Sequence, residues 1–232
     1  MEGKRTAMNN MKIATWNLMR PTERTVSRNE IFLEELRNSN ADILVLTETN
    51  SVINPGAGYF SRSTKELPAE FEGFKYSKGE NRTSIFSKFL FGRDFKTYDE
   101  YTSVCSEILT PYGRLIFYAT IIGVTGGKDK RFVQDFESQK SDINKLAGDI
   151  CVVGDFNISF SGYPYPSRET INQANIYFET QGMQILTKEL ADCPDHISIT
   201  KSYLQNCKTQ KTKGAVDKKI SDHALVTINL TF

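Results

Sequence analysis

Polar side chains that could bind a cation or move a proton adjoin short apolar runs at four places along the chain. The four clusters are Trp16-Asn17, Thr47-Glu48-Thr49-Asn50, Gly154-Asp155-Phe156-Asn157 and Ser221-Asp222-His223. The apolar runs beside them are typical of buried strands. Residues at the ends of a rigid set of strands are a common source of active sites, so we expect these clusters to meet in one acidic site.

The oxygen atoms of these clusters favour a hard divalent cation. Glu48 and Asp155 each follow a buried run, Asp222 precedes one, and Asn157 lies two residues beyond Asp155. A carboxylate beside a buried strand is costly unless it is paired or bound to a cation. Carboxylate and amide oxygens suit Mg²⁺ or Mn²⁺. Such an ion stabilises charge on a phosphoryl oxygen and helps to activate water, so metal-dependent hydrolysis is the predicted chemistry.

His223 adds an imidazole to this acidic site, directly after Asp222. A functional histidine needs a partner that orients its ring. Asp195 stands just before the predicted strand Ile197–Thr200 and could supply that partner. The pair would keep the ring protonated and ready to contact a phosphate.

The hydrophobic pattern predicts a mixed α/β fold. Apolar or alternating runs predict eight strands, and residues recurring at helical spacing predict three helices. The strands are Lys12–Thr15, Ile43–Leu46, Thr83–Ser87, Ser103–Leu109, Leu115–Ile122, Ile150–Val153, Ile197–Thr200 and Ala224–Leu230. The helices are Arg28–Ser39, Phe132–Leu146 and Glu169–Gln181. The stretch 54–80 and the lysine-rich segment Lys208–Lys219 are predicted to be loops, the second of them mobile.

Strand–helix–strand units occur in both halves, over 12–46 and 132–153, and each ends in an acidic turn. This weak repeat, without a Pro/Gly/Ser linker, predicts two layered sheets with outer helices in a single domain over 11–232. Residues 1–10 are expected to be disordered or frayed, and they lack the apolar region of a secretory signal.

The composition is that of an ordinary soluble globular protein and gives no global reason for binding polyanions or membranes. The 232 residues are 39% hydrophobic and 25% charged, with a net charge of +1, so any attraction for phosphates must be local. No apolar run is long enough to span a bilayer. The four cysteines form no CxxC pair, which favours a reducing, cytoplasmic setting. We expect a monomer without a membrane partner.

The ordered clusters resemble the endonuclease/exonuclease/phosphatase superfamily, which includes pancreatic-type deoxyribonucleases and apurinic/apyrimidinic endonucleases. The resemblance covers nearly the whole chain and includes two further segments, Thr83–Lys88 and Asp195–Ile197. It implies a four-layer α/β/β/α sandwich of two packed mixed sheets, with the site at the rim between the sheets. It also implies a Mg²⁺- or Mn²⁺-dependent phosphodiesterase.

The resemblance implies a role for each site residue. Glu48 would be the principal metal ligand, with Asp222 and Asn17 completing the metal site. Asp155 would hold or activate the attacking water, and Asn157 would orient Asp155 and contact the phosphate. His223 would contact the phosphate as well, held by Asp195.

One position departs from this pattern. Family members usually carry a His or Tyr at the end of the strand that corresponds to Leu115–Ile122, where this chain offers only Thr120 or Thr125. Three explanations are open: the metal assists the leaving group, Tyr112 or Arg114 substitutes, or activity is reduced.

Three functions remain open for the predicted site. The first is a nuclease, with nucleic acid contacted by the lysine-rich loop, by Arg82 and Arg114, and by Tyr163 in the aromatic segment Tyr163-Pro164-Tyr165. The second is a phosphatase or phosphodiesterase acting on a small or lipid-derived phosphate ester. The third is a non-catalytic phosphate-binding module.

Overall fold

Two six-stranded mixed sheets form the centre of the computed structural model, which describes residues 9–232. The first sheet contains β1 (Asn10–Asn17), β2 (Ile43–Asn50), β3 (Phe60–Ser63), β6 (Glu80–Ser87), β13 (Lys208–Lys213) and β14 (Val226–Thr231), in the order β13-β14-β1-β2-β6-β3. The second contains β7 (Phe91–Phe95), β8 (Val104–Thr110), β9 (Gly113–Ile121), β10 (Ile150–Asp155), β11 (Met183–Ile185) and β12 (Asp195–Thr200), in the order β11-β12-β10-β9-β8-β7.

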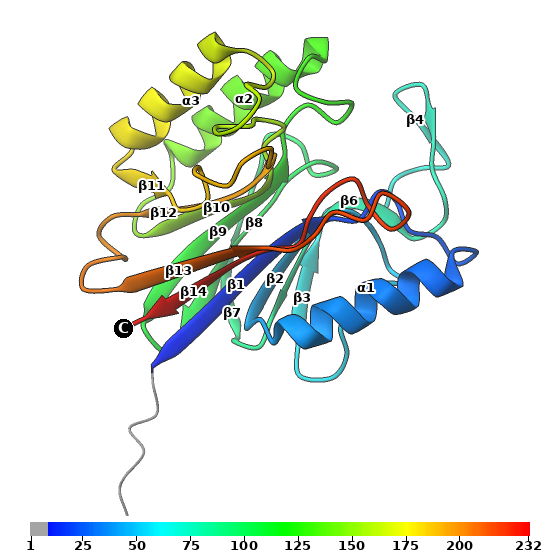
Figure 1. The fold of residues 1–232 in the computed structure, drawn as a ribbon, viewed down its shortest axis with the longest axis horizontal. Helices are drawn as coiled ribbons and strands as arrows, with labels where there is room; N and C mark the ends of the chain where they lie inside the picture. The colour runs from blue at the N-terminus through cyan, green and yellow to red at the C-terminus, as the bar shows by residue number, and fades with distance from the viewer. Residues whose placement is uncertain (1–8) are drawn as a thin grey trace, which may run out of the picture.

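The outer faces of the sheets carry the helices (Figure 1). Helix α1 (Val26–Ser39) covers the first sheet, and α2 (Lys130–Ile143) and α3 (Arg168–Thr180) lie together on the second. A small two-stranded sheet, β4 (Glu70–Phe71) with β5 (Phe74–Lys75), stands apart from both large sheets. The predicted four-layer α/β/β/α sandwich is confirmed. No helix within residues 9–232 has the length and apolar character needed to cross a membrane.

Alternating side chains divide each sheet between two cores. Ile13, Val45, Phe117 and Val153 face the space between the sheets, in one buried apolar cluster. The intervening residues of the same strands face the helices, where further clusters form beneath α1 and beneath α2 and α3. Period-two alternation with both faces buried explains why these strands are nearly continuous apolar runs.

The topology brings the polar clusters to one edge of the sandwich. β1 is parallel to β2, and β9 is parallel to β10. The last residues of β1 and β10, Asn17 and Asp155, are hydrogen-bonded to each other, so both pairs end at the same edge. β12 is antiparallel to β10, and its first residue, Asp195, lies opposite Asp155. β14 is antiparallel to β1, so the Ser221–His223 segment that precedes it reaches the same edge.

Two segments predicted to be loops form strands instead. Lys208–Lys213 pairs along its length with β14 as the edge strand β13, because backbone pairing needs no apolar face and lysines are common on sheet edges. The 54–80 segment contains β3, which pairs with β6, and the β4–β5 hairpin. Of the N-terminal segment predicted to be frayed, residues 1–8 lie outside the described residues and Asn10 already belongs to β1.

Candidate active site

One amide group joins the two innermost carboxylates of the site. The Nδ2 of Asn17 donates hydrogen bonds to Glu48 Oε1 at 3.0 Å and to Asp155 Oδ2 at 2.9 Å. Its Oδ1 accepts the backbone N–H of Met19 at 2.9 Å, which fixes the direction of the amide. Asn17 was expected to bind the metal, whereas here both its donors and its oxygen hold protein groups, so it acts as a bridge between Glu48 and Asp155.

Asp155 is buried at the end of β10, and burial raises the pKa of its carboxyl. The neighbouring charge of Asp195 raises this pKa further, while His223 and Asn17 lower it. Its Oδ1 accepts the backbone N–H of Asn157 at 2.8 Å. A carboxyl held in this way is oriented and poised to accept a proton.

Asn157 turns its amide nitrogen inward. Nδ2 donates to the carbonyls of Ile122 and Gly123, each at 3.0 Å, and lies 3.5 Å from Asp155 Oδ2. All three neighbours are acceptors, which settles which end of the amide is the nitrogen. The N–H groups are therefore bonded within the protein, an arrangement that suits the predicted orienting of Asp155, and the predicted contact of Asn157 with the phosphate stays a prediction.

His223 and Asp195 form a buried ion pair. Nδ1 of His223 is 2.6 Å from Asp195 Oδ2, and Nε2 is 4.0 Å from Asp155 Oδ2. Burial alone would lower the pKa of the imidazole, but the charges of Asp195 and Asp155 outweigh it and raise this pKa to about 10. The ring is thus protonated at neutral pH, with Nδ1–H donated to Asp195.

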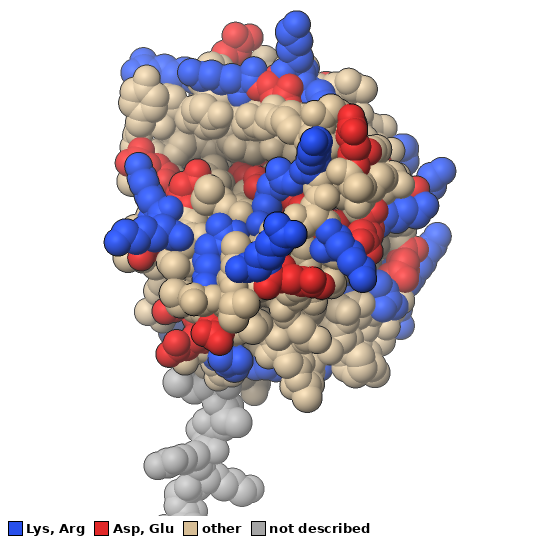
Figure 2. Space-filling view, turned by 90° about the vertical axis from the view of Figure 1, so that its right-hand side faces the viewer, with Lys and Arg blue, Asp and Glu red and all other residues tan. Residues whose placement is uncertain are grey.

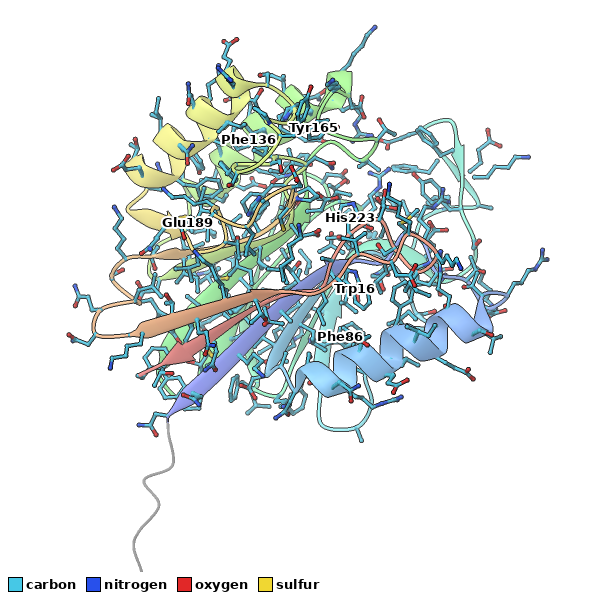
Figure 3. The ribbon with its side chains drawn as sticks, viewed as in Figure 1. Trp16, Phe86, Phe136, Tyr165, Glu189 and His223 are labelled. Carbon is cyan, nitrogen blue, oxygen red and sulfur yellow. The ribbon has the colours of Figure 1, made fainter. Side chains whose placement is uncertain are left out.

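Two residues named only as parts of the clusters fasten the loop that carries His223. The indole Nε1 of Trp16 donates to the carbonyl of His223 at 3.0 Å, and the two side chains lie near each other in Figure 3. The hydroxyl of Ser221 donates to the carbonyl of Asn17 at 2.8 Å and accepts the His223 N–H at 3.0 Å. The order of residues in the chain gives no sign of these cross-links.

Glu48 and Asp222 are the carboxylates best suited to a cation. Burial raises the pKa of the Glu48 carboxyl, and the charge of Asp222 adds to that effect, so a cation would relieve the cost of both charges. Asp222 is 56% exposed and open to solvent. A tighter cluster is formed by Asp155, Asp195 and His223, whose ligand atoms all lie within 4.8 Å of one another. Histidine binds a metal as the neutral ring, so a cation in this second cluster would have to displace the Nε2 proton, which the neighbouring carboxylates stabilise by raising the pKa of His223.

Arg20 is a neighbour of the site that sequence reasoning missed. Its backbone N–H donates to the carbonyl of Glu48 at 2.9 Å. Its guanidinium pairs with the buried Glu80 and lies over the ring of Tyr76, 4.6 Å from the centroid. The proline that follows Arg20 and the separation of 60 residues from Glu80 conceal this arrangement in the sequence.

Two predicted substrate-binding arginines have other partners. Arg82 is buried and donates to Glu72 at 2.7 Å and to Thr102 at 2.9 Å. Arg114 pairs with Glu107 at 3.1 Å near the first residue of β9, whereas the site lies at the last. Their predicted contact with substrate stays a prediction. Tyr163 is 79% exposed, in the loop that follows the Asp155 cluster.

The end of β9 supplies no side chain in place of the missing His or Tyr. Thr120 is buried and 2.6 Å from the hydroxyl of Ser103, and Thr125 bonds to Asp129. Tyr112 stacks on Phe232, 4.0 Å between centroids, in the turn before β9 and so at the opposite end of that strand. What this strand end brings to the site is a pair of backbone carbonyls, those that hold Asn157.

Comparisons with solved structures agree with this fold. No curated protein matches the sequence. Among solved structures, an AP endonuclease from Archaeoglobus fulgidus superposes with a TM-score of 0.68 at 16% identity, covering 94% of this chain and 98% of that one. A humanized D. rerio TDP2 gives 0.70 at 13% identity, covering 96% and 99%. The 3′ phosphatase NExo from Neisseria gives 0.63 at 16% identity, covering 94% and 98%.

Identities this low establish the fold alone. The sequence itself supplies the family, because the pattern of the Endonuclease/Exonuclease/phosphatase family matches residues 14–228. That match spans β1 to β14 and includes every residue of the candidate site. The chain therefore belongs to the Endonuclease/Exonuclease/phosphatase family, whose members hydrolyse phosphoester bonds.

Proposed function

We propose that this protein is a divalent-metal-dependent phosphodiesterase that cleaves the backbone of a nucleic acid by in-line attack of water. The observation that carries the proposal is the Asn17 amide. It joins a carboxylate suited to a metal, Glu48, to a carboxylate suited to a base, Asp155. The protonated His223 lies on the other side of Asp155.

Glu48 and Asp222 are the residues that would hold Mg²⁺ or Mn²⁺. Both are carboxylates, the ligands that these hard cations favour. When bound, the ion would supply positive charge to a phosphoryl oxygen. The raised pKa of Glu48 fits this assignment, because a partly buried carboxylate without a full set of partners gains most from a cation.

Asp155 would take the proton of the attacking water. Its two oxygens are held by Asn17 and by the backbone of Asn157, and burial raises its pKa toward the range in which a general base works at neutral pH. The role of Asn157 is then to fix Asp155 and the nearby backbone.

His223 would donate Nε2–H to a non-bridging phosphoryl oxygen. Its other proton is held by Asp195, so the ring stays charged as negative charge develops on the phosphate. Fixed donors aimed at developing charge are the usual source of large rate effects. Because β9 brings no acidic side chain to the site, we expect faster turnover of esters whose leaving group needs no proton.

Nucleic acid is the proposed substrate class on two grounds. Figure 2 shows a hollow that holds acidic side chains and has Lys and Arg side chains along its rim. Cations around an acidic site suit contacts to phosphates on either side of a cleaved bond. Among the structural neighbours, one is an AP endonuclease and another is a 3′ phosphatase solved with a product DNA hairpin. Tyr163, 79% exposed in the loop that follows the Asp155 cluster, is the proposed stacking contact.

The decisive test compares substrates. Supercoiled plasmid, single-stranded DNA and RNA are incubated with Mg²⁺ or Mn²⁺, beside bis-(p-nitrophenyl) phosphate and a panel of phosphomonoesters. Asp155→Ala serves as the inactive control. We expect nicking that requires the metal and is lost in the control. Turnover of a monoester without nicking would move the function to the phosphatase alternative, and metal binding without any turnover would favour a binding module.

A monomeric, cytoplasmic enzyme is the matching proposal for its setting. All four cysteines are free, in keeping with a reducing compartment.

A further inference from the structure

Two polar side chains occupy the buried face of α2, which is otherwise apolar. Phe132, Phe136 and Ile143 pack against the second sheet, whereas Asp135 and Gln139, one turn apart on the same face, are each only 2% exposed. A buried carboxylate and a buried amide are expensive unless every group is bonded. Asp135 and Gln139 therefore need hydrogen-bond partners in the strand on which α2 packs.

That partner is the backbone at the end of β9. Asp135 Oδ2 accepts the N–H of Gly123 at 3.3 Å, and Gln139 Nε2 donates to the carbonyl of Ile121 at 3.2 Å. Gly123 has φ +68°, and a Cβ there would lie 2.8 Å from the carbonyl oxygen of Gly126. The turn is therefore tight, and side chains of α2 bond to its backbone at Ile121 and at Gly123.

The same turn also bonds to Asn157 and Asp155 at the candidate active site. The carbonyls of Ile122 and Gly123 accept the two N–H groups of Asn157, and the N–H of Ile122 donates to the carbonyl of Asp155 at 2.9 Å. A continuous path of hydrogen bonds thus runs from Asp135 through Gly123 to Asn157, and from Asn157 to the carboxylate of Asp155.

The charge of Asp135 is balanced within the protein. Arg131, one turn earlier on α2, lies 3.7 Å from Asp135 Oδ1 and also pairs with Glu72 in the turn of the β4–β5 hairpin. Glu72 also accepts from Arg82, whose guanidinium contacts the Tyr76 hydroxyl beside Arg20. Asp135 therefore has a charge-dependent path toward the metal side as well as its direct hydrogen bond to Gly123. Asp135→Asn separates the two, because it removes the charge and keeps an acceptor for the Gly123 N–H.

We propose that Asp135, assisted by Gln139, is a positioning residue that sets the Ile122–Gly123 carbonyls and, through them, the orientation of Asn157 and Asp155. This backbone turn, fixed by side chains of α2, lies at the end of β9, the position that lacks an imidazole or phenol. The kinetic consequence rests on the function proposed above, whereas the geometric consequence does not.

The variants separate positioning from stability. Asp135→Ala removes the acceptor for Gly123, and Asp135→Asn keeps one, because its amide oxygen can accept the same N–H. The matched control is Asp142→Ala, which removes a carboxylate two turns further along the same helix that accepts the Tyr98 N–H at 2.6 Å and the Tyr118 hydroxyl at 3.1 Å. The Tyr98 hydroxyl lies 3.5 Å from Gln139 Nε2, so this control also tests whether a disturbance of Tyr98 alone affects kcat.

Kinetics are measured with Mn²⁺ on bis-(p-nitrophenyl) phosphate. Asp135→Ala should lower kcat by about 10- to 100-fold with KM changed by less than about twofold, since a small misplacement of a catalytic group acts on the chemical step. Asp135→Asn should restore kcat to within about threefold of the wild type. Asp142→Ala should lower the melting temperature and leave kcat unchanged.

A double-mutant cycle tests the path. In an Asn157→Ala background, Asp135→Ala should cost no further kcat, because residues that act through one another are not additive. Its effect on the melting temperature should persist. Equal losses of kcat in both backgrounds, or a loss of kcat in Asp142→Ala as large as in Asp135→Ala, would overturn the proposal.

An NMR measurement decides the geometry whether or not the protein turns over any substrate. The side-chain amide signals of Asn157, assigned by their absence from Asn157→Ala, should shift in Asp135→Ala and stay in place in Asp135→Asn and Asp142→Ala. Signals unmoved in a folded Asp135→Ala would refute the positioning role. Moved signals without wild-type turnover would uphold it and reject the proposed phosphodiesterase.

Discussion

Replacing Asp195 with Asn removes one charge from the ion pair that keeps His223 protonated. The two side chains are 2.6 Å apart, and Asp195 is completely buried. The pKa of His223 is raised from 6.5 to about 10, which corresponds to a preference of about 5 kcal/mol for the protonated ring. Asp195 is the only hydrogen-bonded carboxylate, while Asp155 and Asp222 lie 4.0 and 3.7 Å away.

We assign about half of that preference, roughly 2–3 kcal/mol, to Asp195, because the remaining two carboxylates share the rest. Asp195→Asn should then lower the pKa of His223 by about 2, to near 8. The Asn side chain keeps the shape of the site and can still accept the Nδ1–H. The alkaline limb of the pH profile of kcat should shift to lower pH together with the pKa of His223. The variant should therefore lose activity between pH 8 and 10, where the wild type retains it.

Proton NMR reads this change directly, because the chain has only two histidines. His196 is the internal control: burial lowers its pKa to about 4, and it bonds to Thr187 and to the carbonyl of Ile158. Its signal should not titrate between pH 6 and 10 in either protein. A wild-type His223 that titrates near 6.5, or a variant that shifts by less than about one pH unit, would refute the electrostatic reasoning.

The free energy of unfolding should depend on pH through the same ion pair. A pKa raised in the folded state contributes stability that is present in full below 6.5 and is lost as the pH rises through about 10. Asp195→Asn should therefore be destabilising at neutral pH, and the difference from the wild type should shrink between about pH 8 and pH 10. A difference in melting temperature that does not depend on pH would point to lost packing instead.

Four further changes test other parts of the site. Glu48→Gln should weaken Mn²⁺ binding by at least about tenfold in calorimetry, because it removes the most buried ligand charge. Asn17→Ala should lower kcat by about 100-fold at similar KM, since the donor shared by two carboxylates is lost. Gly154→Ala should destabilise by about 3 kcal/mol or more in denaturant titrations, because φ is +132° and the new Cβ would lie 2.0 Å from the Thr120 carbonyl oxygen. His196→Gln should flatten the loss of stability expected in the wild type as the pH falls from 6.5 toward 4, about 3 kcal/mol, because the buried neutral ring must gain a proton on unfolding.

The polar clusters could be predicted to meet because their position depends on strand direction alone. Asn17 ends β1, Glu48 lies two residues before the end of its parallel neighbour β2, and Asp155 ends a strand of the facing sheet. A run of apolar residues that stops at a polar one is visible in the sequence. The hydrogen-bond directions are not visible, because the inward turn of the Asn157 amide depends on carbonyls 34 and 35 residues earlier in the chain.

The edge strand β13 and the partners of Arg82 could not be predicted from the sequence, for physical reasons. Lys208–Lys213 is polar on both faces and joins the sheet only through its backbone, which leaves no periodicity to read. Arg82 lies in a strand beside the site, yet its side chain is buried against Glu72 and Thr102. A charged residue near a predicted site fits a substrate contact and a structural ion pair equally well until the partner is known.

Several residues with a strained backbone conformation lie in or beside the candidate active site. Eight non-glycine residues within 9–232 have positive φ, and four of them, Met19, Arg20, Glu48 and Asn157, are site residues or their immediate neighbours. Each such conformation costs on the order of 1 kcal/mol and persists only where the surroundings fix it. Here the surroundings are buried strands on both sides of the edge and the bonds of Asn17, Gly123 and Ser221. The core of the sandwich therefore stabilises a site geometry that the local sequence would not adopt, and loosening of the turn beside α2 should affect catalysis before it affects folding.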